Sequence, residues 1–153
     1  MTTILFVCTA NRYRSPLAAA IFQQELRLRR PGEHWTVVSA GTWADNGSPA
    51  AAGALVGAQS MGLNLGAHRS RSIDAELVRA ADLILVMEQG QKEAIRSEFP
   101  ESAGKMQLIS EATTGVAYDV PDPVGPADGT NVAAELSEMI HAGFERICAL
   151  VGK

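Results

Sequence analysis

Short apolar runs alternate with longer helix-like segments along the chain. Strands are predicted where a few consecutive apolar residues lie between polar ones, at residues 4–7, 36–39, 82–87 and 106–109. Helices are predicted where apolar residues recur at helical spacing or where proline and glycine mark the ends, at residues 16–30, 50–61, 73–81, 88–99 and 132–151. This alternation predicts an α/β fold of the three-layer αβα type, with a four-stranded parallel sheet between two layers of helices.

The remaining long stretches are polar and are predicted to be loops. Residues 41–51 are rich in Gly, Asn, Asp, Ser and Pro, and a second loop is expected at about residues 110–131. The sequence contains no internal repeat, no low-complexity tract and no break in composition. We therefore expect residues 1–153 to form a single domain, which agrees with the usual domain size of about 100–150 residues.

Charge and composition narrow the class of protein. The 13 Lys and Arg residues and 17 Asp and Glu residues give a net charge of −4, which provides no general attraction to nucleic acid or to anionic membranes. No apolar run approaches the ~20 residues of a membrane span, and the N-terminus lacks the basic region of a signal peptide. Two cysteines are too few for a disulfide scaffold or a cysteine-rich zinc site. We expect a soluble, cytoplasmic monomer without a metal or organic cofactor, in which any anion site is local.

The loop after the first strand carries the strongest chemical signal. It connects Cys8, at the end of the strand, to the N-terminus of a helix, where free N–H groups and the helix dipole favour an anion. The same groups stabilise a cysteine thiolate, and the Arg14 guanidinium can bind two phosphate oxygens at once. A buried structural cysteine followed by a polar turn is the alternative interpretation, but a turn with two arginines is not a core environment. The loop therefore predicts phosphoryl transfer through a cysteinyl-phosphate.

The motif Cys-X5-Arg-Ser-Pro, a few residues from the N-terminus, resembles the low-molecular-weight protein tyrosine phosphatase family. Further matching segments are Ser39-Ala40-Gly41-Thr42, His68-Arg69-Ser70-Arg71, Val86-Met87-Glu88 and Asp122-Pro123. The resemblance implies a phosphate-binding loop between the first strand and the first helix. It also implies hydrolysis of phosphotyrosine in proteins, or of small aryl phosphates, in two steps.

The family's site residues map onto this chain one by one. Cys8 would be the nucleophile and Asp122 the general acid and base, with Pro121 and Pro123 restricting the loop around it. Asp119 is the competing acid, but the family places its acid directly before proline. The phosphate would be held by the Arg14 side chain and by the backbone of Thr9, Ala10, Asn11, Arg12, Tyr13, Arg14 and Ser15. The hydroxyl of Ser15 would support the thiolate, while Asn11, Ser39 and His68 would brace the loop.

Three positions depart from the family's pattern. Tyr13 occupies the place where many members carry a second, protective cysteine, so that disulfide cannot form. Val124 stands where an aromatic residue usually stacks on the substrate ring. Arg12 replaces the isoleucine of tyrosine-directed members and the threonine of protein arginine phosphatases. Its positive charge should repel the guanidinium of phosphoarginine and attract acidic residues beside a phosphotyrosine.

Several other functions remain open on the sequence. A protein arginine phosphatase is the main alternative, because residues 115–125 also resemble that branch. An arsenate reductase would need further cysteines, and Cys148 is expected to lie in the core on one helical face with Ile140, Phe144 and Val151. A non-catalytic oxyanion-binding module would keep the loop without turnover. Trp43 could line the substrate cleft or could simply pack on the surface loop.

Overall fold

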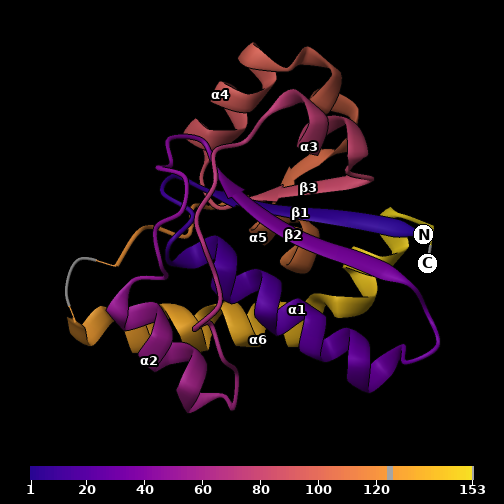
Figure 1. Ribbon diagram of the computed structural model, residues 1–153. Helices are drawn as coiled ribbons and strands as arrows, with labels where there is room; N and C mark the ends of the chain where they lie inside the picture. Colours follow the sequence, from indigo (N-terminus) through magenta and orange to yellow (C-terminus); the bar gives the residue numbers. More distant parts are fainter. Residues whose placement is uncertain (124–125, 153) are drawn as a thin grey trace.

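The computed structural model describes residues 1–123 and 126–152. Its centre is a four-stranded parallel sheet in the order β2-β1-β3-β4, as predicted (Figure 1). The strands are β1 (Thr2–Cys8), β2 (Trp35–Gly41), β3 (Leu83–Val86) and β4 (Met106–Leu108). β1 and β2 exceed the predicted apolar runs because their pairing continues without a break from Thr2 with Trp35 to Cys8 with Gly41.

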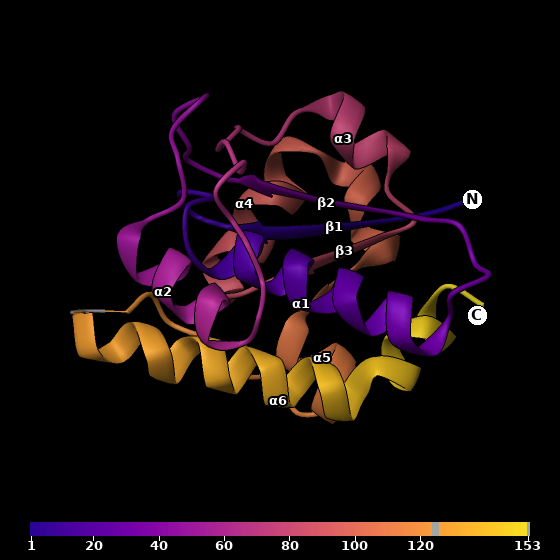
Figure 2. The same cartoon turned by 60° about the horizontal axis from the view of Figure 1, so that its bottom comes forward.

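Helices cover both faces of the sheet (Figure 1). One face carries α1 (Arg14–Arg29), α2 (Ala52–Ser60), α5 (Ile109–Thr114) and α6 (Pro126–Leu150). The other face carries α3 (Ala75–Ala80), α4 (Gln89–Glu98) and the 3-10 helix η1 (Pro100–Lys105). Figure 2 shows α6 along the base of the molecule, against α1, α2 and α5.

The central strand β1 is buried on both of its faces. Ile4 and Phe6 belong to the larger core under α1 and α6, whereas Leu5 and Val7 belong to the smaller core under α3 and α4. All four side chains are fully buried. This explains the continuous apolar run in the sequence, because a strand covered on both sides has no polar face.

Aromatic packing joins the larger core to the sheet. The ring of Phe22 in α1 lies 5.4–5.7 Å from the ring centroids of Phe6, Trp35 and Phe144. Cys148 is fully buried in the same core, as predicted, and burial raises the pKa of its thiol to about 11. The end of α6 is therefore a structural part of this core.

The clearest differences between the predicted and the observed elements concern α1, α5 and α6. α1 begins at Arg14 instead of Pro16, and the proline still falls in the first turn, where its missing N–H costs no helical hydrogen bond. Residues 109–114 form α5 inside the segment predicted as strand and loop, and the helix ends at Gly115, whose φ is 82°. α6 begins at Pro126 instead of residue 132.

Residues 1–123 and 126–152 contain no helix that is both long enough and apolar enough to cross a membrane.

Candidate active site

The segment from Cys8 to the start of α1 is a tight loop whose carbonyl oxygens face the surrounding protein. Four of these oxygens accept hydrogen bonds, at distances of 2.7–3.0 Å. The acceptors are the oxygens of Cys8, Thr9, Asn11 and Arg12, and the respective donors are the N–H groups of Thr42 and Trp43, the Nε2–H of His68 and the N–H of Ala51. The opposite sides of these peptide units, which carry the N–H groups, therefore face the inside of the loop.

No acceptor within the described residues is bonded to the backbone N–H groups of Thr9, Ala10, Asn11 or Arg12. Consecutive N–H groups that converge in this way form an anion-binding concavity. The helix α1 follows directly, and its positive end adds to the same field. The loop predicted to bind phosphate thus has the backbone geometry that binding an anion requires.

Asn11 lies at the centre of the loop's support. Its φ of 56° is in the left-handed region, which asparagine tolerates better than most residues. Its Nδ2 donates to Ser15 Oγ and to Ser39 Oγ, both at 2.9 Å. Its Oδ1 accepts the backbone N–H of Arg71 at 2.9 Å. The structure therefore brings together Asn11, Ser15, Ser39 and His68, which the sequence analysis grouped as supporting residues.

Cys8 is 2% exposed and its Sγ lies 3.0 Å from Ser15 Oγ. Because Ser15 Oγ already accepts a hydrogen bond from Asn11, its own proton is free to point at the sulfur. A hydroxyl that donates to sulfur favours the thiolate, which is the nucleophilic form of cysteine. The only competing acceptor recorded for this hydroxyl in the described part of the chain is the carbonyl oxygen of Ala40, at 3.4 Å.

The guanidinium of Arg14 is 1% exposed and is held from behind. Its Nη1 donates to a carboxylate oxygen of Glu88 and, at 2.8 Å, to the carbonyl oxygen of Val120. Its Nε lies 3.1 Å from Asp122 Oδ1, yet no described acceptor is aligned with it as a hydrogen bond. A buried donor without an aligned partner is costly in a folded protein, so its presence beside the anion-binding loop points to an anionic ligand.

The two candidate acids occupy different environments. The Asp122 side chain is 62% exposed and reaches Arg14, so it borders the anion site. Asp119 is instead used in the structure, because its Oδ1 accepts the N–H of Gln89 at the start of α4, at 2.9 Å. The placement of Asp122 agrees with the role that the resemblance implies for it.

Gly41 permits the close approach of β2 to the loop. A Cβ atom at this position would lie 2.3 Å from the carbonyl oxygen of Thr9 and 2.9 Å from the Cβ of Ala44. Any side chain here would therefore push the backbone of the loop out of place. The Ser-Ala-Gly-Thr segment, noted in the sequence only as part of a resemblance, thus has a steric reason for its glycine.

Sequence reasoning missed two side chains that hold the site from α4. Besides contacting Arg14, Glu88 caps α4 together with Gln91. The Nε2 of Gln91 donates to Thr9 Oγ1 at 3.1 Å, and its Oε1 accepts the N–H groups of Met87 and Glu88. Their position gave a usable signal, because the polar residues after β3 lie at the same sheet edge as the end of β1.

The residues that depart from the family's pattern have distinct surroundings. Tyr13 packs against the larger core, with its ring beside Gly53 of α2. Arg12 is exposed, and its Nε donates to the carbonyl oxygen of Pro49 at 2.9 Å. Val124 lies outside the described residues. Trp43 is 85% exposed and borders a cavity of about 380 Å³ next to Thr9, so its indole is not packed onto its own loop.

The second thiol of the chain lies away from the loop. Residues 1–123 and 126–152 contain no cluster of three or more His, Cys, Asp or Glu side chains that could hold a metal ion. Both cysteines are free thiols, and Cys148 lies in the core, not at the loop.

Comparisons with known proteins show which family the chain resembles. A model of the family described as low molecular weight phosphotyrosine protein phosphatase matches residues 3–153. A probable low molecular weight protein-tyrosine-phosphatase, EpsP, from Ralstonia nicotianae is 38% identical over 143 residues, covering 94% of this chain and 91% of the relative. A protein-arginine-phosphatase from Geobacillus stearothermophilus is 37% identical over 122 residues, covering 80% and 78%.

The fold is also found in solved structures. The YwlE arginine phosphatase from Geobacillus stearothermophilus superposes with a TM-score of 0.87 at 32% identity, covering 97% of this chain and 94% of the other. The match in sequence and the match in structure both extend over nearly the whole chain. The chain therefore belongs to the low molecular weight phosphotyrosine protein phosphatase family.

Proposed function

We propose that the protein hydrolyses phosphotyrosine in proteins through a cysteinyl-phosphate intermediate. The observation that carries the proposal is the buried guanidinium of Arg14, whose Nε lacks an aligned acceptor within the described residues and adjoins the loop of Cys8. The arrangement supplies a nucleophile, a clamp for two phosphate oxygens and a ring of N–H donors. All of these come from one loop and the first turn of one helix.

The reaction proceeds in two balanced steps. In the first, the Cys8 thiolate attacks phosphorus, the bond from phosphorus to the ester oxygen breaks, and Asp122 gives its proton to the leaving phenolate. In the second, Asp122 takes a proton from water, the oxygen attacks phosphorus and the thiolate leaves with inorganic phosphate as product. Arg14 and the loop N–H groups stabilise the charge on the equatorial oxygens in both steps. The hydroxyl of Ser15 stabilises the sulfur each time it carries negative charge.

Protein arginine phosphatase activity is the second candidate, because relatives named for each activity match at similar identity. The exposed guanidinium of Arg12 favours phosphotyrosine. It lies on the phosphate loop, where it would face the positively charged leaving group of phosphoarginine. Arsenate reduction is disfavoured, because the second thiol, Cys148, is buried in the core and its raised pKa keeps it protonated.

The deciding experiment compares kcat/KM for phosphotyrosine and phosphoarginine peptides of the same sequence, with Cys8→Ser as the blank. A clear preference for phosphotyrosine supports the proposal. A preference for phosphoarginine moves the protein to the second candidate and contradicts the argument from Arg12. The absence of turnover on both substrates would overturn the proposal and favour a non-catalytic anion-binding module.

The assignment of the acid has its own test. Asp122→Ala should slow hydrolysis of esters with poor leaving groups by about 10²-fold or more, and activated aryl phosphates much less. Asp119→Asn is the matched control, because that carboxylate contacts α4 and not Arg14. Equal slowing of both substrate types in Asp122→Ala would mean that another group supplies the proton.

The clamp is tested by Arg14→Lys, which should lose most activity because an ammonium group cannot bind two oxygens in one plane. Near-normal kcat/KM in that variant would contradict the clamp.

We further propose that residues 1–153 act as one domain and as a monomer, because all the site residues come from a single chain. Two free thiols suit a reducing compartment, which supports a cytoplasmic location.

A further inference from the structure

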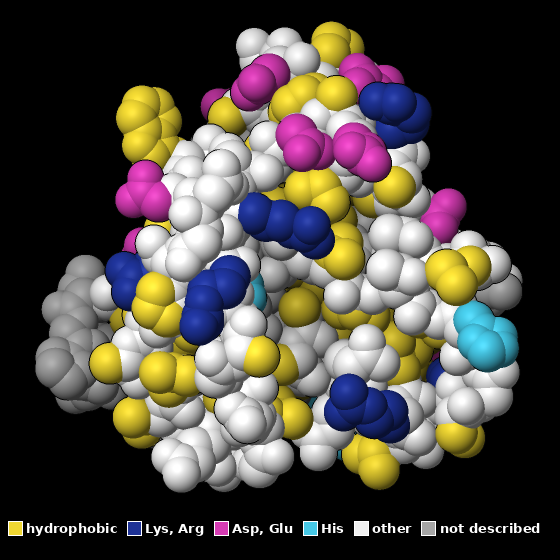
Figure 3. All heavy atoms as spheres, viewed as in Figure 1, with side chains coloured by type: hydrophobic (Ala, Val, Ile, Leu, Met, Phe, Trp, Pro, Cys, Tyr) yellow, Lys and Arg dark blue, Asp and Glu magenta, His cyan; other side chains and the backbone are white. Residues whose placement is uncertain are grey.

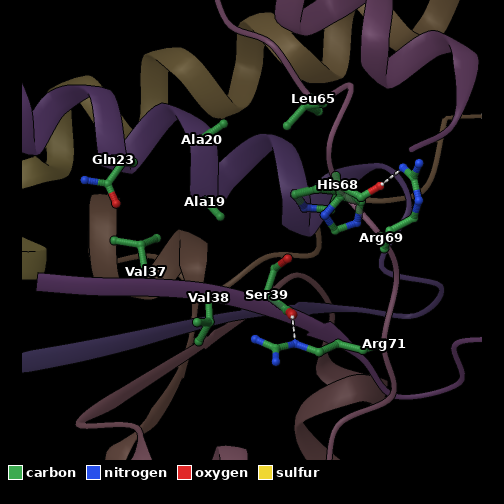
Figure 4. A pocket seen from close by; sticks show the side chains of 11 residues that line it. Ala19, Ala20, Gln23, Val37, Val38, Ser39, Leu65, His68, Arg69 and Arg71 are labelled. Atoms are coloured by element: carbon green, nitrogen blue, oxygen red, sulfur yellow. Dashed lines mark hydrogen bonds between the residues drawn. The ribbon is translucent and has the colours of Figure 1, made fainter. Parts of the chain in front are cut away.

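A second hollow lies on the face of the molecule in front of β2 and α1. It has a volume of about 450 Å³ and is lined by β2, α1 and residues 65–71. Figure 3 shows it as an open hollow on this face. Its floor is apolar and is formed by Ala19, Ala20, Val37 and Leu65. Its rim is polar and includes Ser39, His68, Arg69 and Arg71 (Figure 4). We call this hollow the β2 groove.

Two exposed arginines at the β2 groove are held by backbone carbonyl oxygens. Arg71 donates from Nε to the carbonyl oxygen of Ser39 at 3.2 Å, and Arg69 donates from Nη1 to the carbonyl oxygen of His68 at 2.7 Å. Figure 4 shows the two side chains diverging from their segment, with Arg71 alongside β2. Neither joins an ion pair within residues 1–123 and 126–152. Backbone carbonyls thus orient both guanidinium groups and leave their charges uncompensated.

The β2 groove is connected to the phosphate-binding loop through a third arginine. The Nε of Arg12 donates to the carbonyl oxygen of Pro49, and Pro49 is paired with Arg69 in an antiparallel bridge. Arg12 also takes part in none of the ion pairs found among the described side chains. A basic line, Arg12–Arg69–Arg71, therefore leads from the phosphate loop to the β2 groove, in a chain whose net charge is −4.

The rim of the β2 groove is rigidly tied to the same loop. His68 donates to the carbonyl oxygen of Asn11, and the backbone N–H of Arg71 donates to Asn11 Oδ1. In addition, β2 is an edge strand of the described sheet, and on its outer side only its last residue, Gly41, has backbone partners among the described residues, namely Arg71 and Ile73. An edge strand beside a groove suits an extended segment, and preorganised charges lower the entropy lost on binding.

We propose that the β2 groove docks an extended acidic segment of the phosphoprotein substrate, on one side of the phosphorylated residue. The proposal rests on the function proposed above and adds a preference for substrate sequence. Carboxylates of the segment would pair with Arg12, Arg69 and Arg71, while its apolar side chains would contact the floor. This recognition is independent of the contacts that hold the phosphoryl group.

Docking of this kind acts on substrate binding and not on the chemical step. Contacts that are equal in the ground state and the transition state lower KM and leave kcat unchanged. Each exposed pair of charges contributes modestly, so each arginine should account for about a threefold effect in kcat/KM. The effect should shrink as the salt concentration rises, because exposed charges are screened.

The test uses two phosphotyrosine peptides that differ only in flanking residues, which are acidic in one peptide and neutral in the other. The quantity compared is the ratio of their kcat/KM values within each variant, which cancels any general change in activity. We expect an acidic preference of about thirtyfold in the parent protein, about tenfold in Arg69→Gln, and about threefold in Arg69→Glu, because Arg12 and Arg71 remain in both variants. Arg71→Gln should lower the ratio in the same way. Arg96→Glu, an exposed arginine of α4 on the opposite side of the sheet, is the control and should keep the ratio.

Each other outcome contradicts the inference in a recognisable way. A ratio near one in the parent protein would show that no acidic docking exists. A ratio that is unchanged in Arg69→Glu and in Arg71→Gln would place the recognition outside the β2 groove. Inhibition by an acidic peptide that carries no phosphate, together with equal kcat/KM values for the two phosphopeptides, would indicate that the β2 groove binds a separate partner and not the substrate. Failure of the proposed function looks different, since neither phosphotyrosine peptide would then be turned over.

Discussion

Replacing Asn11 tests whether the shape of the phosphate loop depends on one buried amide. The Asn11 side chain makes three hydrogen bonds of 2.9 Å, and the residue is fully buried at a φ of 56°. Each bond contributes about 1 kcal/mol net, and alanine in the left-handed region costs about 1 kcal/mol more. Asn11→Ala should therefore lower the free energy of unfolding by about 4 kcal/mol. It should also lower kcat/KM by about 10²-fold, the usual cost of a displaced oxyanion donor.

Asn11→Asp separates the loop's stability from its chemistry. Aspartate keeps the acceptor for the Arg71 N–H and tolerates the backbone angle, so the loss of stability should be smaller than in Asn11→Ala. The new carboxylate oxygen, however, would accept a hydrogen bond from the Ser15 hydroxyl, whose proton would then no longer point at the Cys8 sulfur. It also places negative charge beside the phosphate. We expect a loss of activity at least as large as in Asn11→Ala.

Urea denaturation measures the free energy of unfolding of each variant, provided that the m-value is unchanged. Steady-state kinetics on an aryl phosphate measure kcat/KM. The reasoning would be refuted if Asn11→Ala lost less than about 1 kcal/mol and kept kcat/KM within a fewfold of the parent. It would also fail if Asn11→Asp were as active as the parent protein, because the proton of Ser15 would then have no bearing on the thiolate.

Three further predictions concern Glu88, the thiols and Glu111. Glu88→Ala removes the carboxylate to which Nη1 of Arg14 donates and should destabilise the fold by about 2–3 kcal/mol in urea denaturation. An effect below about 1 kcal/mol would contradict the role of this pair. At pH 8 the folded protein should react with iodoacetamide once, at Cys8, and inorganic phosphate should block this reaction, because the pKa of Cys148 is raised to about 11 by burial. Labelling of Cys148 in the folded state, detected by peptide mass spectrometry, would count against this. The Leu108 N–H and Lys92 lower the pKa of Glu111 below its usual 4.5. Glu111→Gln should therefore be less stable than the parent protein above about pH 4.5. The difference in Tm between the two proteins should disappear as the pH falls through the lowered pKa.

The parts of the site that the sequence predicts best are those that lie close together in the chain. Cys8, Arg14 and Ser15 belong to one loop and the turn that follows it, so their proximity follows from local structure alone. Asp122 lies more than a hundred residues later, and only the resemblance to a known family assigned it to the site. The contact from Glu88 to Arg14 depends on the pairing of β3 with β1, which no local pattern encodes.

The elements of the fold also divide into those that the local sequence predicts and those that tertiary contacts determine. The strands β1 and β3 are predictable because burial on both faces leaves an apolar run. The six residues of α5 escaped prediction because the segment Ile-Ser-Glu-Ala-Thr-Thr has no clear helical period. Its ends are set by tertiary contacts and turn chemistry, namely the Glu111 carboxylate that accepts the Leu108 N–H and the positive φ of Gly115. Such short helices are defined by their caps more than by their apolar pattern.

The position of α6 has a consequence for synthesis of the protein. The larger core includes Leu136, Ile140, Phe144 and Ile147 of α6, packed under the helix that follows the Cys8 loop. At ~5–20 residues per second, the 25 residues of α6 take roughly 1–5 s to be translated. Until they emerge, β1 and α1 lack the surface that covers them. The nascent chain therefore carries its reactive thiol on an incompletely packed scaffold, and the phosphate loop matures only when the last of the described helices has docked.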